Sequence, residues 1–254
     1  MGTWKSNACQ TVVVLTIGAL VLGCSSSRGP AKPQNLVLRT PDGLRLMATL
    51  WKPKGGKQHP AVLLIANPEQ DRGAFGPLGE RLAAAGIVAL AVDMRIQGES
   101  LRANEFLDPL STESLRHLRD DVQYLLDYLR RADYVDPERV GAVACAESAD
   151  LVLQSLTTSP CLAAIALLSP VLSDSVLEEL RTRPRPLFAV ASYNDAAAAP
   201  IVQQLQQSSP HGSSYYRIYF AAGRGSDMLW GPEANDLIAR LVSWFGTVLG
   251  VRRT

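Results

Sequence analysis

Two short stretches near the start of the chain alternate between apolar and polar residues. They are NLVLRT (35–40) and LRLMATLWKP (44–53), and Pro41-Asp42-Gly43 lies between them. Alternation with a period of two indicates strands that bury one face, and Pro, Asp and Gly favour a tight turn. We therefore expect an antiparallel hairpin at the start of the folded domain.

Six later stretches are almost continuously apolar. They are AVLLIA (61–66), IVALAVD (87–93), RVGAVAC (139–145), LAAIALLS (162–169), PLFAVAS (186–192) and YYRIYFAA (215–222). Helical patterns separate these stretches. Apolar strands that alternate with helices are typical of a parallel sheet covered by helices on both faces.

Two of the helical patterns carry a regular apolar stripe. One stripe comprises Leu115, Leu118, Val122, Leu125, Leu126 and Leu129, and the other comprises Ile238, Leu241, Val242, Phe245 and Leu249. Spacings of three and four residues place each stripe on one face of a helix. We expect both stripes to pack in the core and to carry no chemistry.

The N-terminal segment has a different pattern. Lys5 precedes the apolar run TVVVLTIGALVLG (11–23), which ends directly before Cys24. This run is too short for a membrane-spanning helix, which needs about 20 apolar residues, so a signal sequence is the better interpretation. The phrase VLGC resembles the lipobox of bacterial lipoproteins, and an ordinary cleaved signal is the alternative.

The lipobox resemblance implies that the chain is cut before Cys24 and that this cysteine is acylated. Several acyl chains together give a stable anchor, so the expected partner is the lipid bilayer. The expected location is the bacterial cell envelope, at the outer membrane and facing the periplasm. Residues 1–23 would be the signal peptide, residues 24–34 the lipidated cysteine with a flexible tether, and residues 35–254 the folded domain.

Export would place the thiols in an oxidising compartment. Cys145 ends one predicted strand and Cys161 precedes the next. In a parallel sheet these positions lie at opposite ends, ~16 Å apart, whereas a disulfide requires ~4.4–6.8 Å between Cα atoms. We expect two free, buried thiols.

Composition and charge exclude several classes of function. The chain has 25 Lys and Arg, 24 Asp and Glu, and 47% hydrophobic residues, and loss of residues 1–23 would remove one lysine and no acid. A globular domain without net charge offers no electrostatic reason to bind nucleic acid. The sequence also lacks metal-ligand spacing and a glycine-rich phosphate loop, so we expect no metal and no cofactor.

Four longer stretches carry a resemblance to a fold family. They are FGPLGERLAAAGIVALAVDMRIQGES (75–100), VDPERVGAV (135–143), LAAIALLSPVL (162–172) and PLFAVASYND (186–195). Their order and content resemble the α/β-hydrolase superfamily, in particular its dienelactone-hydrolase-like and short lipase-like branches, over about residues 35–250. The resemblance implies an α/β fold with a mostly parallel central sheet, an N-terminal antiparallel hairpin and helices on both faces.

The resemblance also locates the three catalytic positions. The family places its nucleophile on a strand-to-helix corner written small-x-nucleophile-x-small, which here is residues 144–148, Ala-Cys-Ala-Glu-Ser. Ala146 therefore occupies the nucleophile position, and it has no atom that can attack a carbonyl. The base position in AAGRGSDML (221–229) holds Arg224, whose guanidinium stays protonated and cannot act as a base. Asp195 fills the acid position.

Few residues near this corner could take over the missing catalytic roles. Asn67 stands where the family has the HG phrase of its oxyanion loop, and it can still donate a hydrogen bond. Ser148 is a weak alternative nucleophile, and the side chain of Cys145 is expected to point to the opposite face of the strand. The three histidines are expected at the other end of the sheet or on a helix: His59, His211 and His117.

Three functions are compatible with this pattern. The first is a catalytically silent, membrane-anchored domain. In it Arg224 either pairs with Asp195 or Glu147, or binds a carboxylate or another small anion together with nearby helix amides. The second is an active serine hydrolase or esterase of the dienelactone-hydrolase-like type, in which either the register at the elbow differs or a non-standard nucleophile such as Ser148 attacks with an unfamiliar base. The third is a scaffold in envelope assembly, for which the sequence identifies no protein partner.

Overall fold

The computed structural model describes residues 32–55, 58–104, 112–156, 162–208 and 211–251. The expected signal segment, Cys24 and Cys161 lie outside these ranges, as does most of the expected tether. In the part of the chain that the structure describes, no helix is both long enough and apolar enough to cross a membrane.

The expected hairpin is present. Strands β1 (Gln34–Arg39) and β2 (Arg45–Trp51) pair antiparallel. In the turn, the Thr40 amide donates to the Leu44 carbonyl over 3.0 Å. Gly43 has a φ of 88°, a conformation that glycine adopts without steric cost.

Six further strands extend the sheet: β3 (His59–Ile65), β4 (Val88–Val92), β5 (Val135–Cys145), β6 (Ala164–Leu168), β7 (Leu187–Ser192) and β8 (Tyr215–Tyr219). The strand order is β1-β2-β4-β3-β5-β6-β7-β8. β2 pairs antiparallel with β4, and all later pairs are parallel. The apolar runs thus predicted every strand, although β5 begins at Val135 instead of residue 139 and β8 ends at Tyr219 instead of residue 222.

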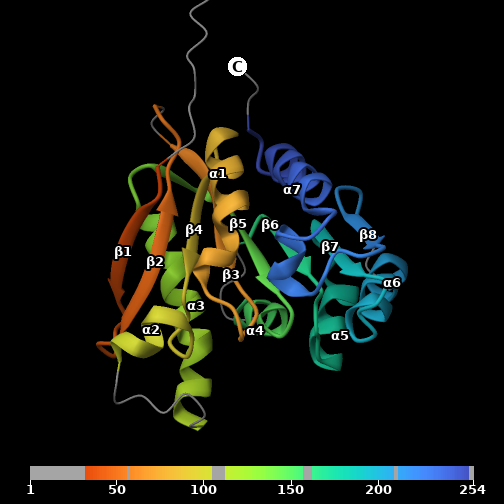
Figure 1. The fold of residues 1–254 in the computed structure, drawn as a ribbon, viewed down its shortest axis with the longest axis horizontal. Coiled ribbons are helices and arrows are strands. Elements are labelled where there is room, and N and C mark those ends of the chain that lie inside the picture. Colours follow the sequence, from red (N-terminus) through yellow and green to blue (C-terminus); the bar gives the residue numbers. More distant parts are fainter. Residues whose placement is uncertain (1–31, 56–57, 105–111, 157–161, 209–210, 252–254) are drawn as a thin grey trace, which may run out of the picture.

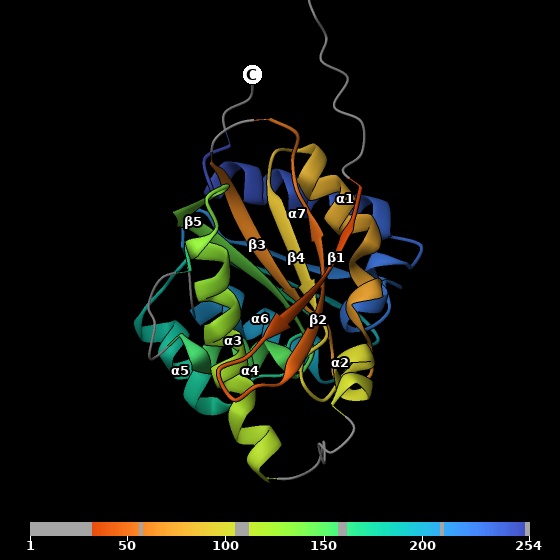
Figure 2. The same cartoon turned by 90° about the vertical axis from the view of Figure 1, so that its left-hand side faces the viewer.

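Helices cover both faces of the sheet (Figures 1 and 2). On one face lie α1 (Gly76–Ala84) and α7 (Ala234–Val248). On the other lie α3 (Thr112–Arg131), α4 (Ser148–Ser155), α5 (Asp174–Thr182) and α6 (Ala198–Ser208). The sheet therefore has a separate apolar core on each side.

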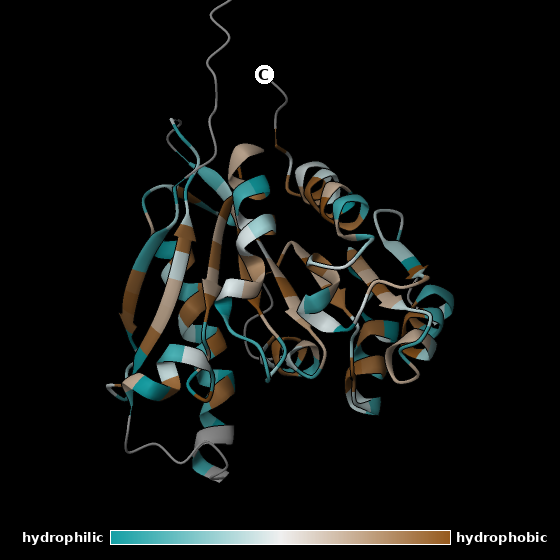
Figure 3. Ribbon diagram, viewed as in Figure 1, coloured by the Kyte–Doolittle hydropathy of each residue, from teal (hydrophilic) through white to brown (hydrophobic). Residues whose placement is uncertain are grey.

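Alternate residues of the central strands enter these two cores. Leu63 of β3 packs on the side of α3 to α6, and Leu64 packs on the side of α1 and α7. Figure 3 shows the resulting apolar strands between helices whose outer faces are polar. The two helical stripes also pack as expected, with Val122 and Leu126 of α3 and Leu241 and Phe245 of α7 buried; the side chain of Leu115 is outside the described part.

Short helical segments follow the carboxyl ends of three strands. They are the 3-10 helix Arg72–Phe75 (η1) after β3, α2 (Gly98–Ala103) after β4 and the 3-10 helix Gly225–Leu229 (η2) after β8. The buried carboxylate of Asp93 joins the first two, because it accepts from the Arg72 amide (2.7 Å) and the Glu99 amide (2.8 Å). These segments build the edge of the sheet at which the expected catalytic positions lie.

Candidate functional site

The corner at residues 144–148, here called the elbow, keeps the conformation of a nucleophile turn. β5 ends at Cys145, α4 begins at Ser148, and Ala146 between them has a φ of 50°. The Ala146 amide donates to the Leu168 carbonyl (3.0 Å), and its carbonyl accepts from the Ala149 and Val171 amides (each 3.1 Å). For an alanine, the left-handed conformation costs roughly 1–2 kcal/mol, so the surrounding hydrogen bonds hold the turn in a strained state.

Ala146 is also inaccessible. Its relative exposure is 0%, so its methyl group is covered on every side. A covalent catalyst requires both a nucleophilic atom and a path by which the substrate reaches it. The elbow provides neither at this position.

Arg224, at the expected base position, forms an ion pair with Glu147 of the elbow. Its Nη2 lies 2.5 Å from Oε1 of Glu147, and the two side chains are 43% and 46% exposed. The hydrogen bond to Glu147 raises the pKa of the Arg224 guanidinium further, and the charges of Asp195 and Glu69 act in the same direction. Of the pairings expected from the sequence, the structure therefore shows Arg224 with Glu147.

Asp195, at the acid position, follows β7 as expected. Its Oδ1 accepts a hydrogen bond from the Ala198 amide (3.1 Å), so the side chain caps α6. Its Oδ2 is buried and has no hydrogen-bond partner among the described residues. In a working triad this carboxylate would orient an imidazole, and here no imidazole contacts it.

Asn67 lies in the loop after β3, and both ends of its side-chain amide are engaged. Its Oδ1 accepts from the amide (3.1 Å) and the hydroxyl (2.6 Å) of Ser226 in η2. Its Nδ2 donates to Glu69 over 3.0 Å. Gly225 allows this contact, because a Cβ there would lie 2.8 Å from Asn67 Oδ1. The side chain of Asn67 thus links two loops in this structure.

The hydroxyl of Ser148, the alternative nucleophile, is buried and makes a structural hydrogen bond. Ser148 is 6% exposed, and its hydroxyl donates to the Ala66 carbonyl over 2.7 Å. No histidine is available as its base: His59 contacts Gly55 and Gly86 carbonyls, His117 contacts Asp120 and Glu113, and His211 lies in the turn before β8. Ser148 therefore has neither access nor a general base.

Cys145 packs in the core on the side of α1 and α7, as the strand alternation predicted. It is free and fully buried. Burial raises the pKa of its thiol strongly, with a smaller contribution from the charge of Asp227. The thiol therefore stays protonated at neutral pH and is a poor nucleophile.

The contacts of Glu69, Ser226 and Asp93 were not anticipated from the sequence. Glu69 lies in the loop after β3 and Ser226 lies in η2, and neither has a local signature, so their meeting at Asn67 depends on the tertiary fold. Asp93 could have been anticipated from the phrase DMRIQGES, in which Gly98 permits the close approach: a Cβ at Gly98 would lie 2.4 Å from Asp93 Oδ2.

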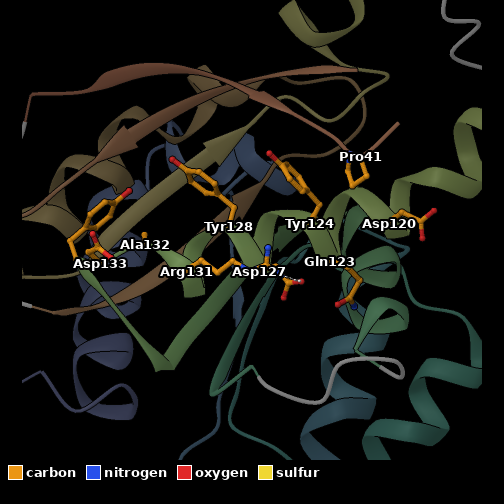
Figure 4. Close-up of a pocket in the computed structure, with 10 residues that line it drawn as sticks. Pro41, Asp120, Gln123, Tyr124, Asp127, Tyr128, Arg131, Ala132 and Asp133 are labelled. Carbon is orange, nitrogen blue, oxygen red and sulfur yellow. Dashed lines mark ion pairs between the residues drawn. The ribbon is translucent and has the colours of Figure 1, made fainter. Parts of the chain in front are cut away.

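Two cavities bear on possible ligands. The first, of about 450 Å³, lies at the carboxyl edge of the sheet and is lined by Ser192, Asn194, Asp195, Ala196, Ala221, Gly223 and Arg224. The second, of about 680 Å³, runs along α3 beside Pro41 and is lined by Tyr124, Tyr128 and Tyr134 among others (Figure 4). The second cavity contains none of the catalytic positions, so only the first belongs to this site. No cluster of potential metal ligands occurs among the described residues.

Comparisons with known proteins agree with this architecture. No family model and no curated protein sequence matches the chain. Among solved structures, a dienelactone hydrolase from Anabaena variabilis is similar with a TM-score of 0.64 and 17% identity, over 86% of this chain and 99% of that one. An esterase from Pyrococcus furiosus is similar with a TM-score of 0.65 and 14% identity, over 87% of this chain and 94% of the esterase.

Longer enzymes contain the same domain as one part. A prolyl endopeptidase is similar with a TM-score of 0.63 and 17% identity, over 88% of this chain but only 39% of the endopeptidase, so the chain spans about two fifths of that enzyme. Identities this low show a shared fold and leave activity to the residues of the site. The sheet order, the elbow and the structural neighbours together show that the chain has the α/β-hydrolase fold, with dienelactone hydrolases among the structures it resembles.

Proposed function

We propose that this chain is a catalytically silent α/β-hydrolase-fold domain that acts by binding. The observation that carries the proposal is Ala146, which occupies the strained apex of the elbow and is fully buried. The turn still imposes a strained left-handed backbone conformation at Ala146. The side chain there has neither the oxygen nor the sulfur atom that a nucleophile requires.

The base and acid positions support the same proposal. Arg224 places a permanent cation at the position where a proton acceptor is required. Its ion pair with Glu147 gives the side chain a structural role instead. Asp195 has no imidazole to orient. A proton relay therefore cannot form from the groups at these positions.

The alternative function is that of an active dienelactone-hydrolase-like esterase with Ser148 as nucleophile. A fluorophosphonate probe, which reacts with activated serines, separates the two functions. The folded protein should remain unlabelled, because Ser148 is buried and hydrogen-bonded to a carbonyl. Stoichiometric labelling of Ser148 would establish the esterase alternative instead.

A binding role gains support from the cavity beside Asp195 and Arg224, which has the size of a small-molecule site. The exposed part of Arg224 favours the small anion suggested by the sequence, but Glu147 already neutralises much of that charge. A scaffolding role would instead use surfaces away from the elbow. The charge of a ligand that fits this cavity therefore depends on how far Glu147 neutralises Arg224.

We further propose that Cys24 is acylated and holds the domain on the bacterial envelope, facing the periplasm. The support is the apolar run 11–23 followed by Cys24. In bacteria supplied with a palmitate analogue, the full-length chain should acquire the label and a Cys24→Ala variant should not. Equal labelling of both proteins, or of neither, would contradict the anchor and favour an ordinary cleaved signal.

A further inference from the structure

The cavity along α3 has a volume of about 680 Å³, and none of its lining residues belongs to the elbow (Figure 4). This volume is that of a small-molecule site. Pro41 of the hairpin turn lines the cavity from the side of the sheet, and the other lining residues lie between 120 and 134. Most of the wall is therefore formed by α3 and the residues directly after it.

The wall that α3 contributes has an aromatic row beside a polar row. Tyr124 and Tyr128 form the aromatic row, and Asp120, Asp127 and Arg131 form the polar row. Spacings of four and seven residues keep each row on one face of the helix. In Figure 4 the two tyrosine rings point to one side of α3, and Asp127 points to the other. A ligand in the cavity meets apolar ring surface and hydrogen-bonding groups together.

Contacts within the fold hold the tyrosine rings in place. A hydrogen bond joins Tyr124 to the backbone of Arg39 at the end of β1. Another joins the side chains of Tyr128 and Tyr134, and Nζ of Lys52 lies 4.1 Å from the ring centroid of Tyr134. Side chains that are fixed before binding lose little conformational freedom when a ligand packs on them.

Charges of both signs surround the cavity. Three carboxylates line it: Asp120, Asp127 and Asp133. Arg131 also lines it, and Arg130 lies 3.6 Å from Asp127. The carboxylate of Asp127 is 49% exposed, so a ligand can reach it. Mixed charges give little attraction for an ion of either sign, whereas carboxylates and guanidinium groups form hydrogen bonds with neutral hydroxyl groups.

From these features we infer that the cavity along α3 binds a neutral saccharide. A sugar ring has C–H groups on its faces and hydroxyl groups around its edge, so it matches an aromatic row beside a polar row. The C–H face lies against the ring of Tyr128, and the hydroxyl groups donate to Asp127 and accept from Arg131. The site is separate from the elbow, so it does not depend on the loss of catalysis.

A protein-observed NMR titration tests the inference with three saccharides as probes: cellotriose, maltotriose and tri-N-acetylchitotriose. At millimolar concentration at least one of them should shift the backbone amide signals of residues 120–134 more than signals elsewhere. Tyr128→Ala removes the ring and should weaken this binding roughly tenfold. Tyr128→Phe keeps the ring and should stay within about threefold of the wild type. Tyr193→Ala, the loss of an exposed tyrosine outside the cavity, should leave the affinity unchanged.

Three results would overturn the inference. They are no shift with any of the three saccharides, equal affinity of wild type and Tyr128→Ala, and tighter binding of benzyltrimethylammonium that is lost in Asp127→Asn. The last result would establish a site for organic cations instead. Signals away from the cavity show in the same spectra whether each variant is folded. Fluorophosphonate labelling tests catalytic silence separately, so the failure of one proposal leaves the other intact.

Discussion

Replacing Arg95 by leucine should lower the free energy of unfolding by about 3–5 kcal/mol. Arg95 and Asp121 are 2% and 1% exposed, and two hydrogen bonds of 2.7 Å join the guanidinium to the carboxylate. A third contact of 3.0 Å reaches Asp42 in the turn of the hairpin. In the variant the Asp121 carboxylate would be buried without its cation. An unpaired charge in the interior is strongly destabilising.

Urea denaturation measures this loss, with Arg102→Leu on the exposed face of α2 as the matched control. Removal of both charges in Arg95→Leu/Asp121→Leu should restore most of the stability, since an apolar pair needs no desolvated charge. Burial raises the pKa of Asp121, so the single variant should regain stability as the pH falls and the carboxyl group becomes protonated. A loss below about 1 kcal/mol at neutral pH, typical of a surface pair, would contradict a buried role for Arg95.

Ala146→Ile should destabilise the fold by about 3 kcal/mol or more, the sum of two separate effects. The φ of 50° at this residue is more strained for a β-branched side chain than for alanine. The site is also fully buried, so the added methyl and methylene groups have no space and must displace their neighbours. The loss is measured by urea denaturation at neutral pH.

Ala146→Gly is the matched variant, because glycine adopts this conformation freely. Its stability should lie within about 1 kcal/mol of the wild type, since relief of backbone strain opposes the greater flexibility of the unfolded chain. If isoleucine were tolerated as well as glycine, the elbow would not have the tight left-handed turn described above.

Much of the fold was predictable because its signals are local. Continuous apolar runs predicted the parallel strands, and alternation predicted the hairpin of β1 and β2. The small residues that flank Ala146 indicated the elbow, and the structure places a left-handed turn there. These features depend on a few consecutive residues, so the sequence contains the information directly.

The partners of the site residues were harder to predict. The sequence left open whether Arg224 pairs with Glu147 or Asp195, since the choice depends on how η2 approaches α4. The engagement of Asn67 by Ser226 joins residues from two distant loops. The buried oxygen of Asp195 depends on its role as a cap of α6. Each of these contacts is set by packing between elements and has no periodic signal along the chain.

The elbow combines a strained backbone turn with a side chain that has no nucleophilic atom. The hydrogen bonds around Ala146 still impose a conformation that alanine disfavours. Around it, Ser148 and Asn67 have structural partners, and Arg224 bridges to Glu147. Among these groups, Oδ2 of Asp195 is the one buried side-chain polar atom without a hydrogen-bond partner in the described part of the chain.

Intact-mass spectrometry of the folded protein after fluorophosphonate treatment decides whether the domain contains an activated serine, with an esterase that has a complete Ser-His-Asp triad as the positive control. We predict an unchanged mass for the wild type. We predict the same for Ala146→Ser, because Arg224 cannot accept the proton of the new hydroxyl. A single probe adduct on the folded wild type, mapped to Ser148 or to any other serine, would show an activated nucleophile and refute catalytic silence.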